Sequence, residues 1–283
     1  MKSVKILLAA AALCVGMSAS AQDFSDDAKY GMWGETNEER ASNIGASNFL
    51  KDELDAKNYA AATVYLQQLL NNCPAASQQT FARGVTIYKN KANRARTIEE
   101  KKVYIDSILL IYDLRLQYFG NHPKNGKDYI LDRKAREFYS YFPDDREGIR
   151  KIFQEAVEAS NEMKGKYDLE LVGIYFAELC ADYENDIISA EDLIAAYDRY
   201  SPAFDGVEEE ADIELKNQFD SAFGQSGAAS CENLETLFTK KLAEDPENEA
   251  LLGQAVALMS RANCQSDFFF ATAEKYYEIK PSS

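Results

Sequence analysis

Histidine, glycine and proline are scarce in this chain of 283 residues, which has 1 histidine, 14 glycines and 6 prolines. The histidine, His122, stands in the turn-like stretch Gly120-Asn121-His122-Pro123. A Ser-His-Asp or Cys-His catalytic arrangement would therefore have to be built around one loop residue. We interpret His122 as a surface turn residue. No glycine-rich phosphate loop appears, and we expect no cofactor.

Acidic residues are abundant, but they do not form a recognisable site. Asp144-Asp145 and the run 208–210 lie where helices are expected to begin, and helix starts attract acids because of the helix dipole. Neither group has the oxygen-ligand spacing of a calcium loop. We expect no metal and no enzyme, with a hydrolase as the least favoured of three functional hypotheses.

Long apolar runs are also missing after residue 21. No later stretch approaches the roughly 20 apolar residues that a membrane helix needs. With 46% hydrophobic and 12% aromatic residues there is still ample material for a packed core. Because glycine and proline are few and no long β-branched alternation occurs, we expect a chain that is nearly all helix.

Residues 1–21 have the pattern of a cleaved secretory signal. Lys2 and Lys5 form the basic start, the apolar run is 6–15, and Ala19-Ser20-Ala21 is the small-residue cleavage site. Lipidation at Cys14 is the alternative, but it would leave a very short apolar run. The prediction is an exported protein, periplasmic or secreted. Removing the two lysines leaves 31 − 2 = 29 basic and 47 acidic residues, a charge of −18, so we expect no binding to nucleic acid.

The stretch 57–74, KNYAAATVYLQQLLNNCP, predicts one amphipathic helix. Ala62, Leu66, Leu69 and Pro74 follow each other at steps of 4, 3 and 5 residues, which places an apolar stripe on one helix face ahead of a stop. This pattern resembles the second helix of a tetratricopeptide repeat, whose period is about 34 residues. The segment 112–120, YDLRLQYFG, is similar to exported repeat proteins of Gram-negative bacteria.

The resemblance implies an all-α, superhelical α-solenoid of antiparallel helix pairs. We expect a signal at 1–21, an acidic lead-in at 22–45 and a repeat domain at 46–283, with an irregular middle at 75–223 and regular repeats at 46–74 and 231–281. Pro246 and Pro281 are 35 residues apart, which brackets the expected period. The chain ends without a polar capping helix, so either the last helix is unusually exposed or the sequence is a fragment.

Cys231 and Cys264, 33 residues apart, are expected to form a disulfide on one edge of the stack. A redox pair or a metal site is the alternative, although nearby histidines are lacking. Cys73 and Cys180 are expected to be buried free thiols. Trp33, in the lead-in, either folds back over the first helix pair or anchors a partner.

One basic cluster interrupts the acidity: Lys89, Lys91, Arg94 and Arg96, followed by Lys101 and Lys102. It is either a solvated connector or a site for an anionic partner. The leading hypothesis is a non-catalytic scaffold that binds a protein or peptide partner. The alternative is a carbohydrate-binding component of a nutrient-uptake system, in which exposed tyrosines would stack on sugar rings.

Overall fold

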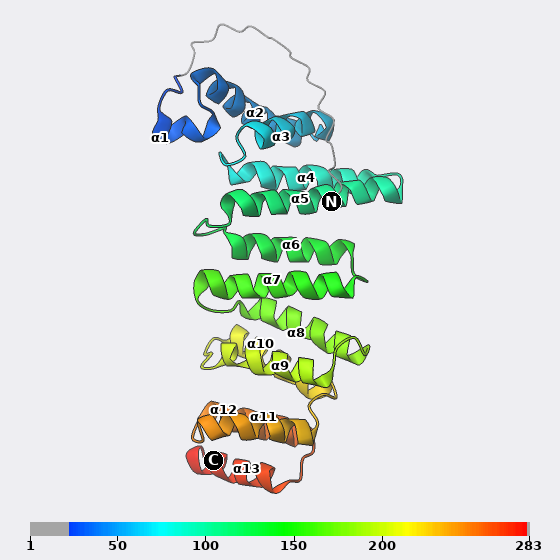
Figure 1. The fold of residues 1–283 in the computed structure, drawn as a ribbon, viewed down its shortest axis with the longest axis vertical. Coiled ribbons are helices and arrows are strands. Elements are labelled where there is room, and N and C mark those ends of the chain that lie inside the picture. Colours follow the sequence, from blue (N-terminus) through cyan, green and yellow to red (C-terminus); the bar gives the residue numbers. More distant parts are fainter. Residues whose placement is uncertain (1–22, 282–283) are drawn as a thin grey trace. The chain divides into compact units, whose positions relative to one another are not determined.

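The computed structural model describes residues 23–281 and contains only helices in that part of the chain. The predicted signal at 1–21 and the lipidation alternative at Cys14 lie outside the described residues. The all-α prediction is confirmed: helices follow one another in close-packed successive pairs (Figure 1). The chain divides into two compact units, residues 1–83 and 84–283.

The first unit is built around one helix pair. Its elements are α1 (Asp27–Tyr30), the 3-10 helix η1 (Gly31–Trp33), α2 (Asn37–Asp55), α3 (Tyr59–Asn72) and the start of α4 (Gln78–Arg94). The predicted stripe is confirmed, because Ala62, Leu66 and Leu69 are all fully buried in α3. Helix α2 begins within the predicted lead-in at 22–45. Thr36 and Glu39 form a capping box that starts it at Asn37.

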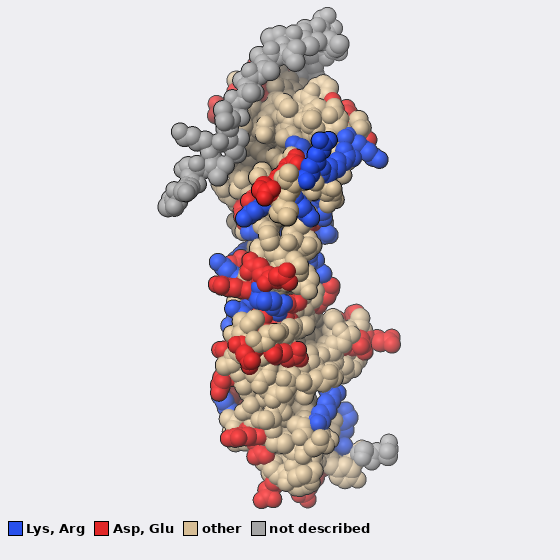
Figure 2. Space-filling model, turned by 90° about the vertical axis from the view of Figure 1, so that its right-hand side faces the viewer, with Lys and Arg blue, Asp and Glu red and all other residues tan. Residues whose placement is uncertain are grey.

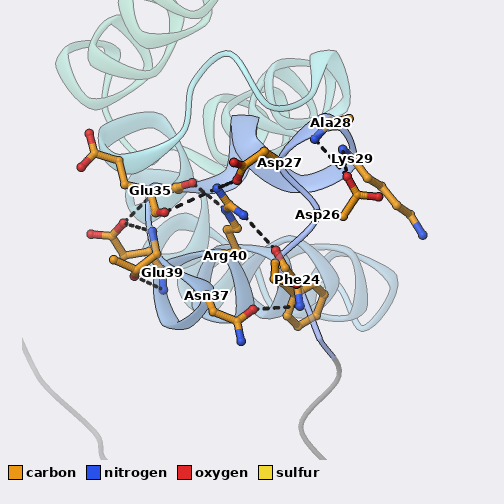
Figure 3. Close-up of polar contacts among 12 residues, drawn as sticks. Phe24, Asp26, Asp27, Ala28, Lys29, Glu35, Asn37, Glu39 and Arg40 are labelled. Atoms are coloured by element: carbon orange, nitrogen blue, oxygen red, sulfur yellow. Dashed lines mark hydrogen bonds and ion pairs between the residues drawn. The ribbon is translucent and has the colours of Figure 1, made fainter.

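The acidic lead-in is fixed to α2 by a buried arginine (Figure 3). The guanidinium of Arg40 donates from Nε to the carbonyl of Gly34 at 2.8 Å and from Nη1 to the carbonyl of Phe24 at 3.0 Å. Its Nη2 pairs with the carboxylate of Asp27. The side chain of Asn43 donates to the carbonyl of Trp33 at 2.7 Å. The segment carrying Trp33 therefore lies back along α2.

In the described part of the chain, the second unit contains the rest of α4, nine further α-helices and one 3-10 helix. They are α5 (Ile98–Phe119), α6 (Lys127–Tyr141), α7 (Arg146–Lys164), α8 (Leu169–Glu184), α9 (Ala190–Tyr200), the 3-10 helix η2 (Ser201–Phe204), α10 (Glu210–Gln225), α11 (Cys231–Glu244), α12 (Glu249–Arg261) and α13 (Asp267–Ile279). Helices α6 and α7 pack along their length, and α7 packs on α8 (Figure 1). Further along, α8 contacts α10, and α10 contacts α12.

Stacked aromatic rings form the core where α8, α9 and α10 meet. The ring of Tyr197 lies 4.0 Å from that of Phe223 and 5.2 Å from that of Phe219, measured between centroids. Phe176 approaches Phe219 to 4.3 Å. These side chains are essentially inaccessible to water, and aromatic pairs add stabilisation beyond the area they bury. The cluster thus packs α8, α9 and α10 against one another.

Two local features of the structure are not evident from the sequence alone. On α5, Tyr118 is 40% exposed, whereas Arg115 is buried. The guanidinium of Arg115 stacks over the ring of Tyr129 at 5.2 Å, so a long cation lies among side chains of the interior. Asp245 follows the last residue of α11 as its C-cap, although Pro246 comes next. Asn248 caps α12 by accepting from the backbone N–H of Leu251.

Candidate functional site

The predicted disulfide is confirmed. The sulfur atoms of Cys231 and Cys264 lie at bonding distance, 2.18 Å, with Cα atoms 5.4 Å apart. Cys231 opens α11 and Cys264 stands between α12 and α13, so the bond ties the end of α12 to the start of α11. The two remaining thiols of the described chain are buried as expected. Burial raises the pKa of Cys73 to about 11 and that of Cys180 to about 12, so both are protonated at neutral pH.

The basic side chains singled out from the sequence contact different neighbours. Lys89 donates to the carboxylate of Glu137 on α6 at 2.6 Å. The ammonium of Lys91 lies over the ring of Tyr104 on α5, 5.7 Å from its centroid, and burial lowers the pKa of this lysine. Arg94 ends α4, and Arg96 follows it in the connection to α5. Lys89 therefore contacts α6, whereas Lys91 contacts α5.

His122 and the acidic pairs do not converge. His122 lies in the turn after α5, where its Nδ1 accepts the backbone N–H of Asn125 at 3.1 Å. Asp145 caps α7 by accepting the backbone N–H of Gly148. Among residues 23–281, no group of three or more His, Cys, Asp or Glu side chains is placed to hold a metal ion.

The candidate functional site is a groove of about 490 Å³ between α10 and α12, closed at one side by α13. We call it the α10–α12 groove. Its α12 wall presents small residues at helical spacing, Ala250, Gly253 and Ala257. A Cβ on Gly253 would stand 3.1 Å from ring atoms of Tyr276, so this ring lies directly against the backbone of α12. The ring therefore occupies the space beside Gly253, and the small side chains of Ala250 and Ala257 leave the open part of the groove.

A carboxylate anchored in the core lies in the groove. The carboxylate of Asp220, on α10, accepts a hydrogen bond from the hydroxyl of Tyr197 at 2.8 Å and lies 3.3 Å from the ammonium of Lys216. The amide of Gln254 on α12 donates to the same carboxylate at 3.4 Å. Burial, and then the negative charge of Asp220, raises the pKa of Tyr197 well above its ordinary value. Asp220 is thereby held in place and its charge is compensated.

The remaining lining groups differ in how far they are paired. At one end of the groove, Lys280 and Glu249 form an exposed ion pair at 2.9 Å. Arg261, at the other end, donates one hydrogen bond to a side chain among the described residues, to the hydroxyl of Ser221 at 3.4 Å. The side chain of Asn217 on α10 is exposed. The groove therefore offers an amide and a guanidinium for hydrogen bonds to a ligand.

Sequence reasoning missed this groove. The signal was present as small residues at positions 250, 253 and 257, spaced three and four apart on α12. Their meaning depends on α10 lying opposite, which only the tertiary structure reveals. Among the described residues, no helix combines the length and apolar composition needed to cross a membrane. Comparisons with protein-family models, with curated proteins and with solved structures found no match.

Proposed function

We propose that the protein is a non-catalytic scaffold that holds a peptide segment of a partner protein in the α10–α12 groove. The observation that carries the proposal is the groove itself: about 490 Å³, with a wall of small residues and exposed polar side chains. Amide side chains such as Asn217 suit a peptide backbone, which presents one donor and one acceptor per residue. The resemblance to tetratricopeptide repeats in residues 57–74 supports the same function.

Filling the groove tests this proposal. Ala257 is exposed and lines the groove, so Ala257→Leu should reduce the open space without disturbing the core. Ala271, exposed on α13 outside the groove lining, supplies the matched control Ala271→Leu. We expect peptides selected from a random displayed library to lose binding to Ala257→Leu and to keep it with Ala271→Leu. Equal binding to both variants would contradict the proposal.

The carbohydrate-binding alternative would require aromatic side chains in the groove. Sugar rings are held by stacking on aromatic faces, whereas Tyr276 is the single aromatic residue lining the α10–α12 groove. Calorimetry with oligosaccharides separates the two functions. Saturable sugar binding that is lost on Tyr276→Ala would favour the alternative, and we expect none.

We further propose that the scaffold acts outside the cytoplasm. The disulfide between Cys231 and Cys264 supports this, because such bonds persist mainly in oxidising compartments. The sequence pattern at 1–21 supports it independently. Expression of the full chain in a Gram-negative host should yield a periplasmic protein whose intact mass corresponds to a start at Gln22. A cytoplasmic protein retaining residues 1–21 would contradict this proposal.

A further inference from the structure

The charges lining the α10–α12 groove do not cancel. The lining contains three cations, Lys216, Arg261 and Lys280, and two carboxylates, Asp220 and Glu249. Lys216 pairs with Asp220 at 3.3 Å, and Lys280 pairs with Glu249 at 2.9 Å. Neither of these two carboxylates is paired with Arg261, and no ion pair joins it to any other acid within residues 23–281. In a chain of formal charge −16, this leaves a local positive excess inside the proposed binding groove.

The surroundings of Arg261 leave its guanidinium available. Its aliphatic part passes near Gly224, where a built Cβ would lie 3.8 Å from the Cδ of the arginine. The head group is exposed and contacts the hydroxyl of Ser221 at 3.4 Å, a long hydrogen bond. A guanidinium presents five N–H donors in a fixed fork that matches a carboxylate. One neutral hydroxyl uses little of that capacity.

We infer that the groove selects a peptide carrying an Asp or Glu side chain that pairs with Arg261. This inference rests on the proposed peptide-binding function and adds the chemistry of the ligand. The groove would hold the peptide backbone beside Asn217, and the acidic side chain would reach the guanidinium at the far end. The Lys280–Glu249 pair at the opposite end is already neutral and adds no preference for charge.

A side-chain carboxylate fits this position better than the carboxylate at a peptide's C-terminus. Arg261 is the last residue of α12, and the C-terminal end of a helix carries partial negative charge. Capture of a terminal carboxylate relies on a nest of backbone N–H groups, which a helix C-terminus does not supply. A long arginine side chain extends beyond the end of the helix and can pair with another side chain. The exposed position of Arg261 also leaves space for a peptide to continue past it.

The test uses a random twelve-residue library displayed without free C-termini and selected on the full chain. Selected peptides, synthesised as C-terminal amides, should carry Asp or Glu at one recurring position. Arg261→Gln should weaken their binding about fivefold. Lys240→Gln, at an exposed lysine of α11 outside the groove, should leave binding unchanged. A peptide with Asn or Gln in place of the acid should bind Arg261→Gln and the unaltered chain equally.

The outcomes separate this inference from the proposed function. One outcome would overturn the inference and retain the groove as the peptide site. In it, the peptides bind Arg261→Gln as tightly as the unaltered chain but lose binding to Ala257→Leu. Binding that needs a free C-terminal carboxylate in place of the acidic side chain would also overturn it. Peptides insensitive to Ala257→Leu, or no selected peptides, would overturn both. Arg261→Glu should shift selection toward Lys or Arg at the same peptide position.

Discussion

Two buried charged side chains, Arg40 and Asp182, are each held by several partners at once. Asp182, on α8, is the clearest case because its side chain is 1% exposed. One carboxylate oxygen accepts from Nε of Arg146 at 2.8 Å and the other from Nη1 of Arg150 at 2.6 Å. Both arginines belong to α7, so the carboxylate ties two adjacent helices. Burying an ion is costly unless its partners remain in place.

Removing the charge of Asp182 should therefore destabilise the fold. Asp182→Asn places an amide N–H₂ group against one of two arginines, and we expect the free energy of unfolding to fall by about 3 kcal/mol. Urea denaturation followed by circular dichroism measures this. The control is Asp55→Asn, which breaks the exposed Lys51–Asp55 pair and should leave the midpoint unchanged. Equal urea midpoints for Asp182→Asn and the unaltered protein would show that the ion pairs of the carboxylate with the two arginines do not stabilise the fold.

At the scale of the helix, local sequence signals predicted where helices lie along the chain, but they did not predict every buried helix face. The bounds of α3 follow from a regular apolar stripe between Asn58 and Pro74. Helix α5 also carries apolar residues on its exposed side, among them Val103 and Leu110, so periodicity did not single out its buried face, and Arg115 lies in the interior against Tyr129. The groove was harder to foresee, because two helices distant in sequence line it. The apolar stripe of one helix does not reveal which other helix packs against it.

Two glycines in neighbouring helices should respond to alanine with opposite signs. Gly165 ends α7 with φ at +68°, a left-handed conformation that a Cβ disfavours. Gly165→Ala should cost about 1 kcal/mol. Gly173 lies within α8, where a Cβ would meet no atom within 4 Å. Gly173→Ala should stabilise by about 0.5 to 1 kcal/mol because glycine disfavours helix interiors.

Thermal or urea unfolding of both glycine variants gives the comparison. The two positions serve as controls for each other, since each change adds one methyl group to the α7–α8 region. Stabilisation by Gly165→Ala would contradict the role of the left-handed cap. Destabilisation by Gly173→Ala would indicate a contact that the space around this residue does not predict.

At the scale of the whole molecule, the described residues contain one disulfide, between Cys231 and Cys264. On the face drawn in Figure 2, acidic and basic side chains are interspersed on a largely uncharged surface. The export hypothesis and the disulfide were both predicted from the sequence, the first from its opening residues and the second from cysteine spacing. The disulfide is present in the structure. The ligand of the groove required side-chain positions that spacing does not provide.

Breaking the disulfide should destabilise the unit that contains it. Its two cysteines are 33 residues apart, and closing such a loop contributes about 3 to 4 kcal/mol by the chain-entropy relation. Cys231→Ser/Cys264→Ser should lower the free energy of unfolding by that amount in urea. Dithiothreitol should lower the stability of the unaltered protein similarly and leave the double variant unchanged. An unaltered protein indifferent to the reductant would contradict this expectation.

The same bond also sets the path along which tension travels. When the chain is pulled from its two ends, force crosses directly from Cys231 to Cys264, and the residues between them bear none of it. Fully extended, those residues would span about 110 Å, and this length cannot be pulled out until the bond between the two sulfur atoms is broken. Single-molecule stretching should show a contour length shorter by this amount in oxidising buffer. Under load, α11 and α12 would be shielded from direct extension, and with them the wall of the groove that carries Arg261.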